Sequence, residues 1–157
     1  MACDAHKYRF DVQARQVYNG DIMLDAHALP ALCLPALASD NGVRAAFVFG
    51  SVARSKARPD SDVDIAVVGH GIDTLSLGAA LSTALRCEVD VVELGLQAPI
   101  PLLRSVLRDG LRIYEREAGA AAEFLSRARS VVELDGPAHD RMMRVFMKRV
   151  AERGVGT

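Results

Sequence analysis

Two stretches decide the fold, Phe47-Val-Phe-Gly-Ser51 and Ser61-Asp-Val-Asp-Ile-Ala-Val-Val68, and ten residues separate Ser51 from Asp62. Apart from its two aspartates, the second stretch is apolar and rich in β-branched residues, which is typical of a strand inside a sheet. Burying an unpaired carboxylate in such a strand is costly, so two carboxylates at positions i and i+2 require a partner. We therefore expect the chain to be organised around a site at these aspartates.

The spacing of the two aspartates indicates a divalent metal site. Alternation along a strand places Asp62 and Asp64 on the same face, with their Cα atoms roughly 6.5 to 7 Å apart. Carboxylate oxygens are hard ligands that suit Mg2+ or Mn2+, and Mg2+ commonly takes one or two carboxylates together with waters and substrate phosphates. At this point an alternative stays open, in which one aspartate ends a turn and the other faces solvent on an edge strand.

The composition is that of one ordinary domain. The chain has 157 residues, with 19 Lys plus Arg against 20 Asp plus Glu, so its overall charge argues against a nucleic-acid partner. It contains neither an apolar run long enough to span a membrane nor a secretory signal pattern, which predicts a cytoplasmic protein with no membrane contact. The three cysteines lack CxxC spacing and fit free thiols in a reducing compartment.

Three segments are predicted along the chain. Residues 1–22 show no sustained period and are expected to form a weakly ordered extension. Residues 23–117 are expected to form the core, and residues 118–157 a helical segment. The core begins with a Leu- and Ala-rich helix over Leu24–Ser39, which Pro30 and Pro35 should kink or break.

The rest of the core alternates strands and helices, which predicts an α/β (α+β) fold with helices packed on a sheet. After the strand over Val43–Phe49 and the acidic strand come a crossover helix and a further strand. A short helix and a last strand close the core. The expected ranges of these four later elements are Thr74–Arg86, Glu88–Leu94, Pro99–Asp109 and Leu111–Tyr114.

The last segment shows two apolar helical stripes, and Asp135-Gly-Pro137 should break the chain between them. Its final stretch alternates methionines with arginines and a lysine. One interpretation is a helix that packs on its own domain with a solvated basic face. The other is a Met-rich surface that binds a partner.

A third carboxylate and an anion-binding turn complete the predicted site. Asp90 lies between two valines in the strand Glu88–Leu94, so it can face the same cleft as the acidic pair. Gly50-Ser51 ends a strand abruptly, where backbone amides can converge on a phosphate and glycine allows close approach. Three carboxylates beside such a turn fit metal-assisted phosphoryl or nucleotidyl transfer, with Asp90 binding metal on the attacking side or taking the proton of an incoming hydroxyl.

Other site chemistries find little support. The sequence has no Gly-x-x-x-x-Gly-Lys-Ser/Thr, no Gly-x-Gly-x-x-Gly and no Gly-x-Ser-x-Gly. These absences argue against a P-loop NTPase, a Rossmann dinucleotide site and a serine hydrolase. Its four histidines lack metal-ligand spacing.

These motifs resemble those of the minimal nucleotidyltransferases of the DNA polymerase beta superfamily, whose signature is Gly-Ser, ten residues, then Asp-x-Asp. The resemblance covers roughly Val43 to Glu117. Ser55 departs from the family, which often has glycine after Ala-Arg. The matching residues are Gly50-Ser51, Ala53-Arg54, Ser61, Asp62-Val-Asp64 and Asp90.

The resemblance implies a mixed-sheet nucleotidyltransferase fold. It implies that the catalytic and metal-binding residues, for Mg2+ or Mn2+, are Asp62, Asp64 and Asp90. It implies that ATP is the substrate and that AMP is transferred with release of pyrophosphate. It further implies an antitoxin that adenylylates a tyrosine of a HEPN-domain toxin. A non-catalytic antitoxin and a transferase acting on a small molecule such as an aminoglycoside stay open, as does a homo-oligomeric state. The implied nucleotide-binding residues are Gly50, Ser51, Arg54 and Ser61.

Overall fold

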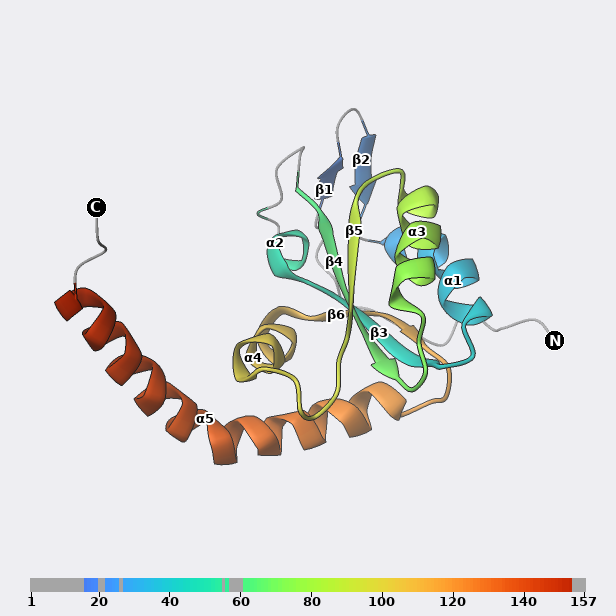
Figure 1. The fold of residues 1–157 in the computed structure, drawn as a ribbon. Coiled ribbons are helices and arrows are strands. Elements are labelled where there is room, and N and C mark those ends of the chain that lie inside the picture. Colours follow the sequence, from blue (N-terminus) through green and yellow to red (C-terminus); the bar gives the residue numbers. More distant parts are fainter. Residues whose placement is uncertain (1–15, 20–21, 26, 55, 57–60, 154–157) are drawn as a thin grey trace.

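Four strands form the central sheet in the order β5-β4-β3-β6 (Figure 1). β4 and β5 run parallel, whereas β3 is antiparallel to both β4 and β6. The predicted mixed sheet is therefore confirmed in this computed structural model, which describes residues 16–19, 22–25, 27–54, 56 and 61–153. The strand bounds are Val43–Phe49 (β3), Val63–Gly69 (β4), Val89–Glu93 (β5) and Leu111–Glu115 (β6).

Helices cover both faces of this sheet (Figure 1). α1 (Leu29–Ser39) and α3 (Thr74–Leu85) pack on one face, and α4 (Ile100–Asp109) and the first half of α5 (Ala120–Arg153) pack on the other. A single turn, α2 (Gly50–Ala53), follows β3 directly. The strands and helices after residue 42 lie within one or two residues of their predicted ranges as far as β6.

The alternation of side chains along β4 divides the core into two layers. Ile65 and Val67 face α1 and α3, whereas Ala66 and Val68 face α4 and α5. Asp64 has the same parity as the second pair. The acidic residue therefore continues the α4 and α5 face of the sheet past the end of its apolar core.

The segment before α1 differs from the prediction. β1 (Gln16–Asn19) pairs antiparallel with β2 (Ile22–Asp25), so part of the extension predicted to be weakly ordered forms a hairpin. The two residues between these strands in the sequence are Gly20 and Asp21, a dipeptide that favours tight hairpin loops. Residues 1–15 lie outside the described residues.

α1 begins at Leu29, five residues later than predicted, because Ile22–Asp25 is paired in the hairpin. Pro30 occupies the first turn, where a backbone N–H has no helical acceptor to lose. Pro35 lies inside the helix, which nevertheless continues to Ser39. α1 is therefore one helix of 11 residues.

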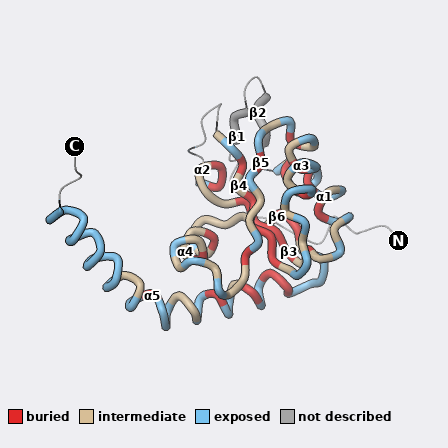
Figure 2. The backbone as a smooth tube through the Cα atoms, viewed as in Figure 1, coloured by how far each residue is buried: buried red, intermediate tan, exposed pale blue. Residues whose placement is uncertain are grey.

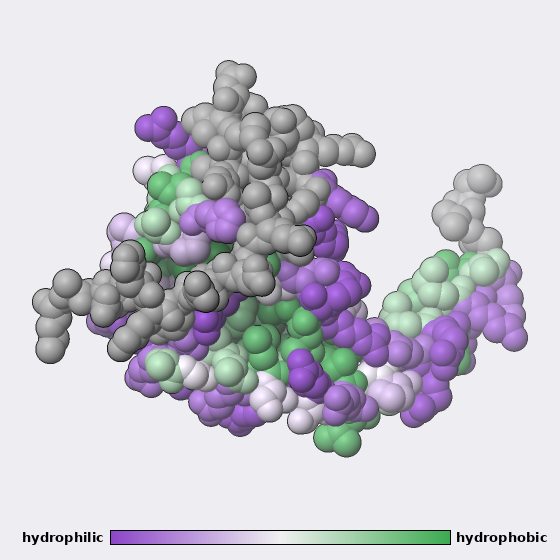
Figure 3. Space-filling model, turned by 180° about the vertical axis from the view of Figure 1, so that it is seen from behind, coloured by the Kyte–Doolittle hydropathy of each residue, from purple (hydrophilic) through white to green (hydrophobic). Residues whose placement is uncertain are grey.

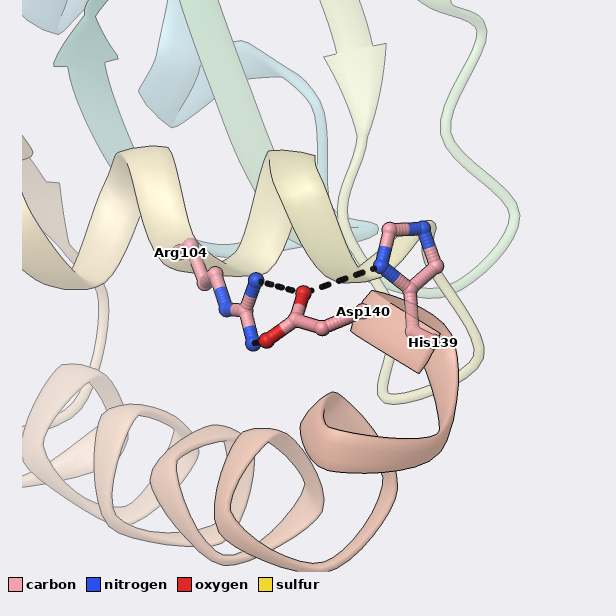
Figure 4. A network of polar contacts seen from close by, with 3 residues as sticks. All are labelled: Arg104, His139 and Asp140. Atoms are coloured by element: carbon pink, nitrogen blue, oxygen red, sulfur yellow. Dashed lines mark hydrogen bonds and ion pairs between the residues drawn. The ribbon is translucent and has the colours of Figure 1, made fainter. Parts of the chain in front are cut away.

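The predicted break at Asp135-Gly-Pro137 is wrong, because α5 continues through these residues as one helix with a total length of 34 residues. Proline removes one backbone donor and kinks a helix, but tertiary contacts can hold the turns on either side. Here Gly136 is buried, and a Cβ at this position would lie 2.7 Å from the Arg104 guanidinium of α4. Arg104 also donates two hydrogen bonds, of 2.7 and 2.9 Å, to the Asp140 carboxylate (Figure 4).

Beyond these contacts the helix changes direction and leaves the domain (Figure 1), and burial ends with it (Figure 2). None of the helices in the described part of the chain has the length and apolar composition needed to cross a membrane.

Candidate active site

Gly50 lies directly against Asp64. β3 ends at Phe49, whose register partner in β4 is Asp64, and Gly50 then turns the chain into α2 with a φ of +74°. A Cβ at position 50 would collide with Asp64 Oδ2 and would lie 3.3 Å from its Cγ. Only glycine adopts this backbone conformation readily and also leaves the space that the Asp64 carboxylate occupies.

Asp64 and Asp90 are neighbours across the parallel pair of strands. They are partners in the register of β4 and β5, so their side chains leave the sheet on the same face. Asp64 is partly buried, whereas Asp90 is exposed. Asp62 is also exposed and lies just before β4 begins.

The charges of these residues converge on Asp64. Burial raises the pKa of the Asp64 carboxyl above its ordinary value, and the negative charges of Asp90 and Asp62 raise it further. The positive charge of Arg54 acts in the opposite direction. The structure therefore brings the three predicted carboxylates and the predicted phosphate-binding arginine into one electrostatic environment.

Arg54 is held at the end of α2. Its backbone N–H donates to the Gly50 carbonyl at 3.2 Å, and its guanidinium Nη1 lies 3.7 Å from Asp109 Oδ2 at the end of α4. Asp109 also pairs with Arg108 at 2.8 Å. Nothing in the sequence pattern indicates the contact between Arg54 and Asp109, because it joins helices that are distant along the chain.

The two predicted serines flank the connection from α2 to β4. Ser51 lies in α2, partly buried, and its carbonyl accepts a 2.9 Å hydrogen bond from the Lys56 backbone. Ser61 is partly buried just before β4. Residues 55 and 57–60 are outside the described residues, so the conformation around Ser55 stays a prediction.

The donor set fits a hard divalent cation. In the part of the chain that the structure describes, no three His, Cys, Asp or Glu side chains stand close enough to form a preassembled metal site. Nevertheless, the negative charges of Asp62 and Asp90 raise the pKa of Asp64, which means that each of them repels the Asp64 carboxylate. A cation among them would offset this repulsion, and carboxylate oxygen is the ligand that Mg2+ and Mn2+ prefer.

A family model, described as polymerase beta, nucleotidyltransferase, matches residues 33–118. The match begins in α1 and ends just after β6, so it includes Gly50, all three carboxylates and both serines. Comparison with curated proteins gives no match.

Three solved structures with a similar fold are from toxin-antitoxin systems. A chain of a toxin-antitoxin with AMP-PNP has a TM-score of 0.61 and 22% identity, over 74% of this chain and 98% of that chain. A chain of the toxin-antitoxin MntA-HepT has a TM-score of 0.57 and 20% sequence identity, over 76% of this chain and 98% of that chain. A chain of the complex of tri-AMPylated Shewanella oneidensis HEPN toxin with MNT antitoxin has a TM-score of 0.58 and 21% sequence identity, over 76% of this chain and 98% of that chain. At these identities the likeness shows the fold.

Proposed function

Because this chain belongs to the polymerase beta nucleotidyltransferase family, we propose that it transfers AMP from ATP to a hydroxyl group of a partner protein. The observation that carries the proposal is the contact of Gly50 with Asp64, which has Asp90 beside it on the next strand. This arrangement sets a glycine, which has no side chain, against a cluster of carboxylates. It is suited to a nucleoside triphosphate carried with a divalent cation.

Four residues bind the nucleotide in this proposal. Gly50 and Ser51 face the triphosphate, because glycine leaves room for phosphate oxygens and the serine hydroxyl can donate to them. Arg54, whose positive charge acts on Asp64, neutralises phosphate oxygens. Ser61, next to the acidic pair, can donate a hydrogen bond from its hydroxyl.

Asp62, Asp64 and Asp90 would hold Mg2+ or Mn2+. When bound, the ion polarises the phosphoryl oxygens and neutralises charge on the leaving pyrophosphate. Asp90 is exposed and accepts the proton of the acceptor hydroxyl. The acceptor oxygen forms a bond to the α-phosphorus, the bond from that phosphorus to the bridging oxygen breaks, and pyrophosphate leaves.

The proposed acceptor is a tyrosine of a HEPN-domain toxin, which would make this chain an antitoxin. This assignment is supported by the fold shared with the Shewanella complex, whose toxin is described as tri-AMPylated. A non-catalytic antitoxin is the second candidate, and one observation favours it. The end of α5 exposes large apolar side chains, as a protein that acts by binding alone would do.

One experiment separates the candidates. The purified chain is incubated with ATP, Mg2+ and the product of the neighbouring gene, and intact-mass and peptide mass spectrometry then locate any AMP adduct. We expect an adduct on tyrosine that requires Mg2+ and is absent with Asp62→Asn. Binding without an adduct would establish the non-catalytic antitoxin. An adduct only on an added aminoglycoside would move the acceptor to small molecules.

A further inference from the structure

The last sixteen described residues of α5, 138–153, form a segment that we call the distal arm. Every residue from 141 to 153 is exposed, although α5 packs closely on the domain before residue 137. Figure 2 shows this change along the helix. Beyond Asp140, which is paired with Arg104 of α4, the arm is therefore exposed to solvent along its described length.

The arm has one continuous apolar stripe. Met143, Phe146, Met147 and Val150 recur at i, i+3, i+4 and i+7, so they lie on one face of the helix. Phe146 is 56% exposed and Met147 58%. Large apolar side chains that are exposed along one helix face mark an interaction surface.

The sides of this stripe are basic. The arm carries four arginines and one lysine against two acidic residues, Asp140 and Glu152. Asp140 is already paired with Arg104, and Glu152 lies 3.8 Å from Lys148. Helical geometry places Arg144 on one side of the stripe and Arg149 and Arg153 on the other.

These charges select the kind of partner. A second copy would bring two basic helices together, with almost no carboxylate to neutralise them, so self-pairing is disfavoured. A protein with an apolar ridge bordered by Asp and Glu would complement both the stripe and its sides. The methionines suit contact with such a ridge, because their flexible thioethers adapt to irregular surfaces.

The direction of the stripe argues for a protein over a lipid surface. Figure 3 shows a hollow between the arm and the domain, with hydrophobic side chains gathered on the side of the arm that faces the hollow. A flat membrane cannot reach a surface turned toward the domain, whereas a helix or ridge of another protein can enter.

The hollow opens on the side of the molecule that carries the active site. In Figure 1 the arm rises on the side of α4 and α2, and α2 begins with Gly50 and Ser51. α4 packs against both α2 and α5. A protein held by the arm is thereby brought next to the carboxylates.

We infer that the distal arm docks the protein that receives AMP, through an apolar ridge bordered by acidic side chains. This inference rests on the proposed function for the identity of the docked protein. The contacts of α4 with Asp140 fix where the arm leaves the domain (Figure 4) and so hold the docked protein near the site. The arm thus acts in binding, and it has no part in the chemistry.

The test measures binding of the neighbouring gene's product to the full chain by isothermal titration calorimetry. We expect the double variant Phe146→Asp and Met147→Asp to bind roughly 30-fold more weakly or worse, as when a central contact is lost. Arg144→Glu with Arg149→Glu should weaken binding about tenfold and reduce its dependence on salt. Leu75→Asp, at an 85% exposed leucine of α3, is the matched control and should bind as the wild type does.

Two further readouts make the outcome decisive. Binding of an ATP analogue and the thermal midpoint should be the same in all variants, since the substituted side chains are exposed and belong to neither the core nor the site. Unchanged affinity in the arm variants would overturn the inference. A wild-type dimer that the same variants dissociate would also overturn it. So would wild-type binding to phosphatidylglycerol vesicles in place of the protein. Binding through the arm without AMP transfer would leave the docking surface standing and reject only the proposed function.

Discussion

Position 50 has two structural requirements: its φ is positive, and the Asp64 carboxylate occupies the space that a side chain would need. Gly50→Ala should destabilise the chain by about 1–2 kcal/mol, the usual cost of the left-handed region for an L-residue. It should also displace Asp64, because the new Cβ occupies the position of Oδ2. We expect nucleotide transfer to fall below detection in a steady-state assay, while urea unfolding shows that the protein still folds.

Gly71→Ala is the matched control for this substitution. Gly71 has a φ of +66°, but an added Cβ would meet nothing within 4 Å, and the residue follows the opposite end of β4. It should therefore lose similar stability and keep full activity. Equal activity of the two variants would contradict the role given to the contact between Gly50 and Asp64.

Asp64 illustrates a compromise between stability and function. Its raised pKa means that the folded state disfavours its ionised form, so its charge lowers stability as the pH rises through that pKa. Asp64→Asn should raise the melting temperature in metal-free buffer at neutral pH, by roughly 2–4 °C. Adding Mg2+ with an ATP analogue should stabilise the wild type and leave the variant unchanged. A variant that melts lower than the wild type without metal would contradict this.

The sequence predicts these residues because the site is an exception to its own surroundings. Two aspartates in an apolar strand and a glycine at an abrupt strand end are visible without a structure. The contact between Arg54 and Asp109 is different, because charged residues at the ends of two helices carry no pattern that identifies their partners. Burial of Asp64 by neighbouring strands also depends on the assembled sheet.

At the scale of elements, the hydrophobic periods predict β3 through β6 well, since each element buries a defined face in one of two core layers. One failure lies where a contact between distant segments decides the structure. Pro137 indicates a break, but Arg104 and the buried Gly136 hold the two halves of α5 in one helix. The hairpin of β1 and β2 is not predicted from the hydrophobic pattern, because its strands are short and only the sequence between them indicates a turn.

The pair of Arg104 and Asp140 predicts a pH dependence for this bend. The Arg104 hydrogen bonds lower the pKa of Asp140 from its ordinary 3.8 to about 2. A depressed carboxyl pKa stabilises the folded state above pH 3.8, and this contribution disappears as the pH falls through 2. The difference in urea midpoint between the wild type and Asp140→Asn should be constant above about pH 5 and shrink toward pH 2.

The control for the Asp140 variant is Glu152→Gln, which removes a carboxylate near the exposed end of α5, where Lys148 lies 3.8 Å away. Such exposed pairs contribute little, so its urea midpoint should follow the wild type at every pH. A difference for Asp140→Asn that grows as the pH falls would show that the pair does not hold the bend.

At the scale of the whole molecule, the chain divides into a site at one edge of the sheet and a helical arm that reaches past it. Figure 1 shows both on the side of α2 and α4. The sequence predicts the site and the amphipathic character of the arm, but the direction of the arm follows from the bend within α5, a helix that contains Pro137 (Figure 1). The proposed catalysis and the proposed partner binding should therefore be separable by substitution.

The most direct test of nucleotidyl transfer compares ATP labelled at the α-phosphate with ATP labelled at the γ-phosphate. With Mg2+ and the acceptor protein, the wild type should transfer label from α-labelled ATP alone. Asp64→Asn should be slower by roughly 1,000-fold, because metal-assisted charge stabilisation contributes several kcal/mol. Transfer of the γ-label, or equal rates for the wild type and Asp64→Asn, would contradict a nucleotidyltransferase centred on the carboxylate that Gly50 faces.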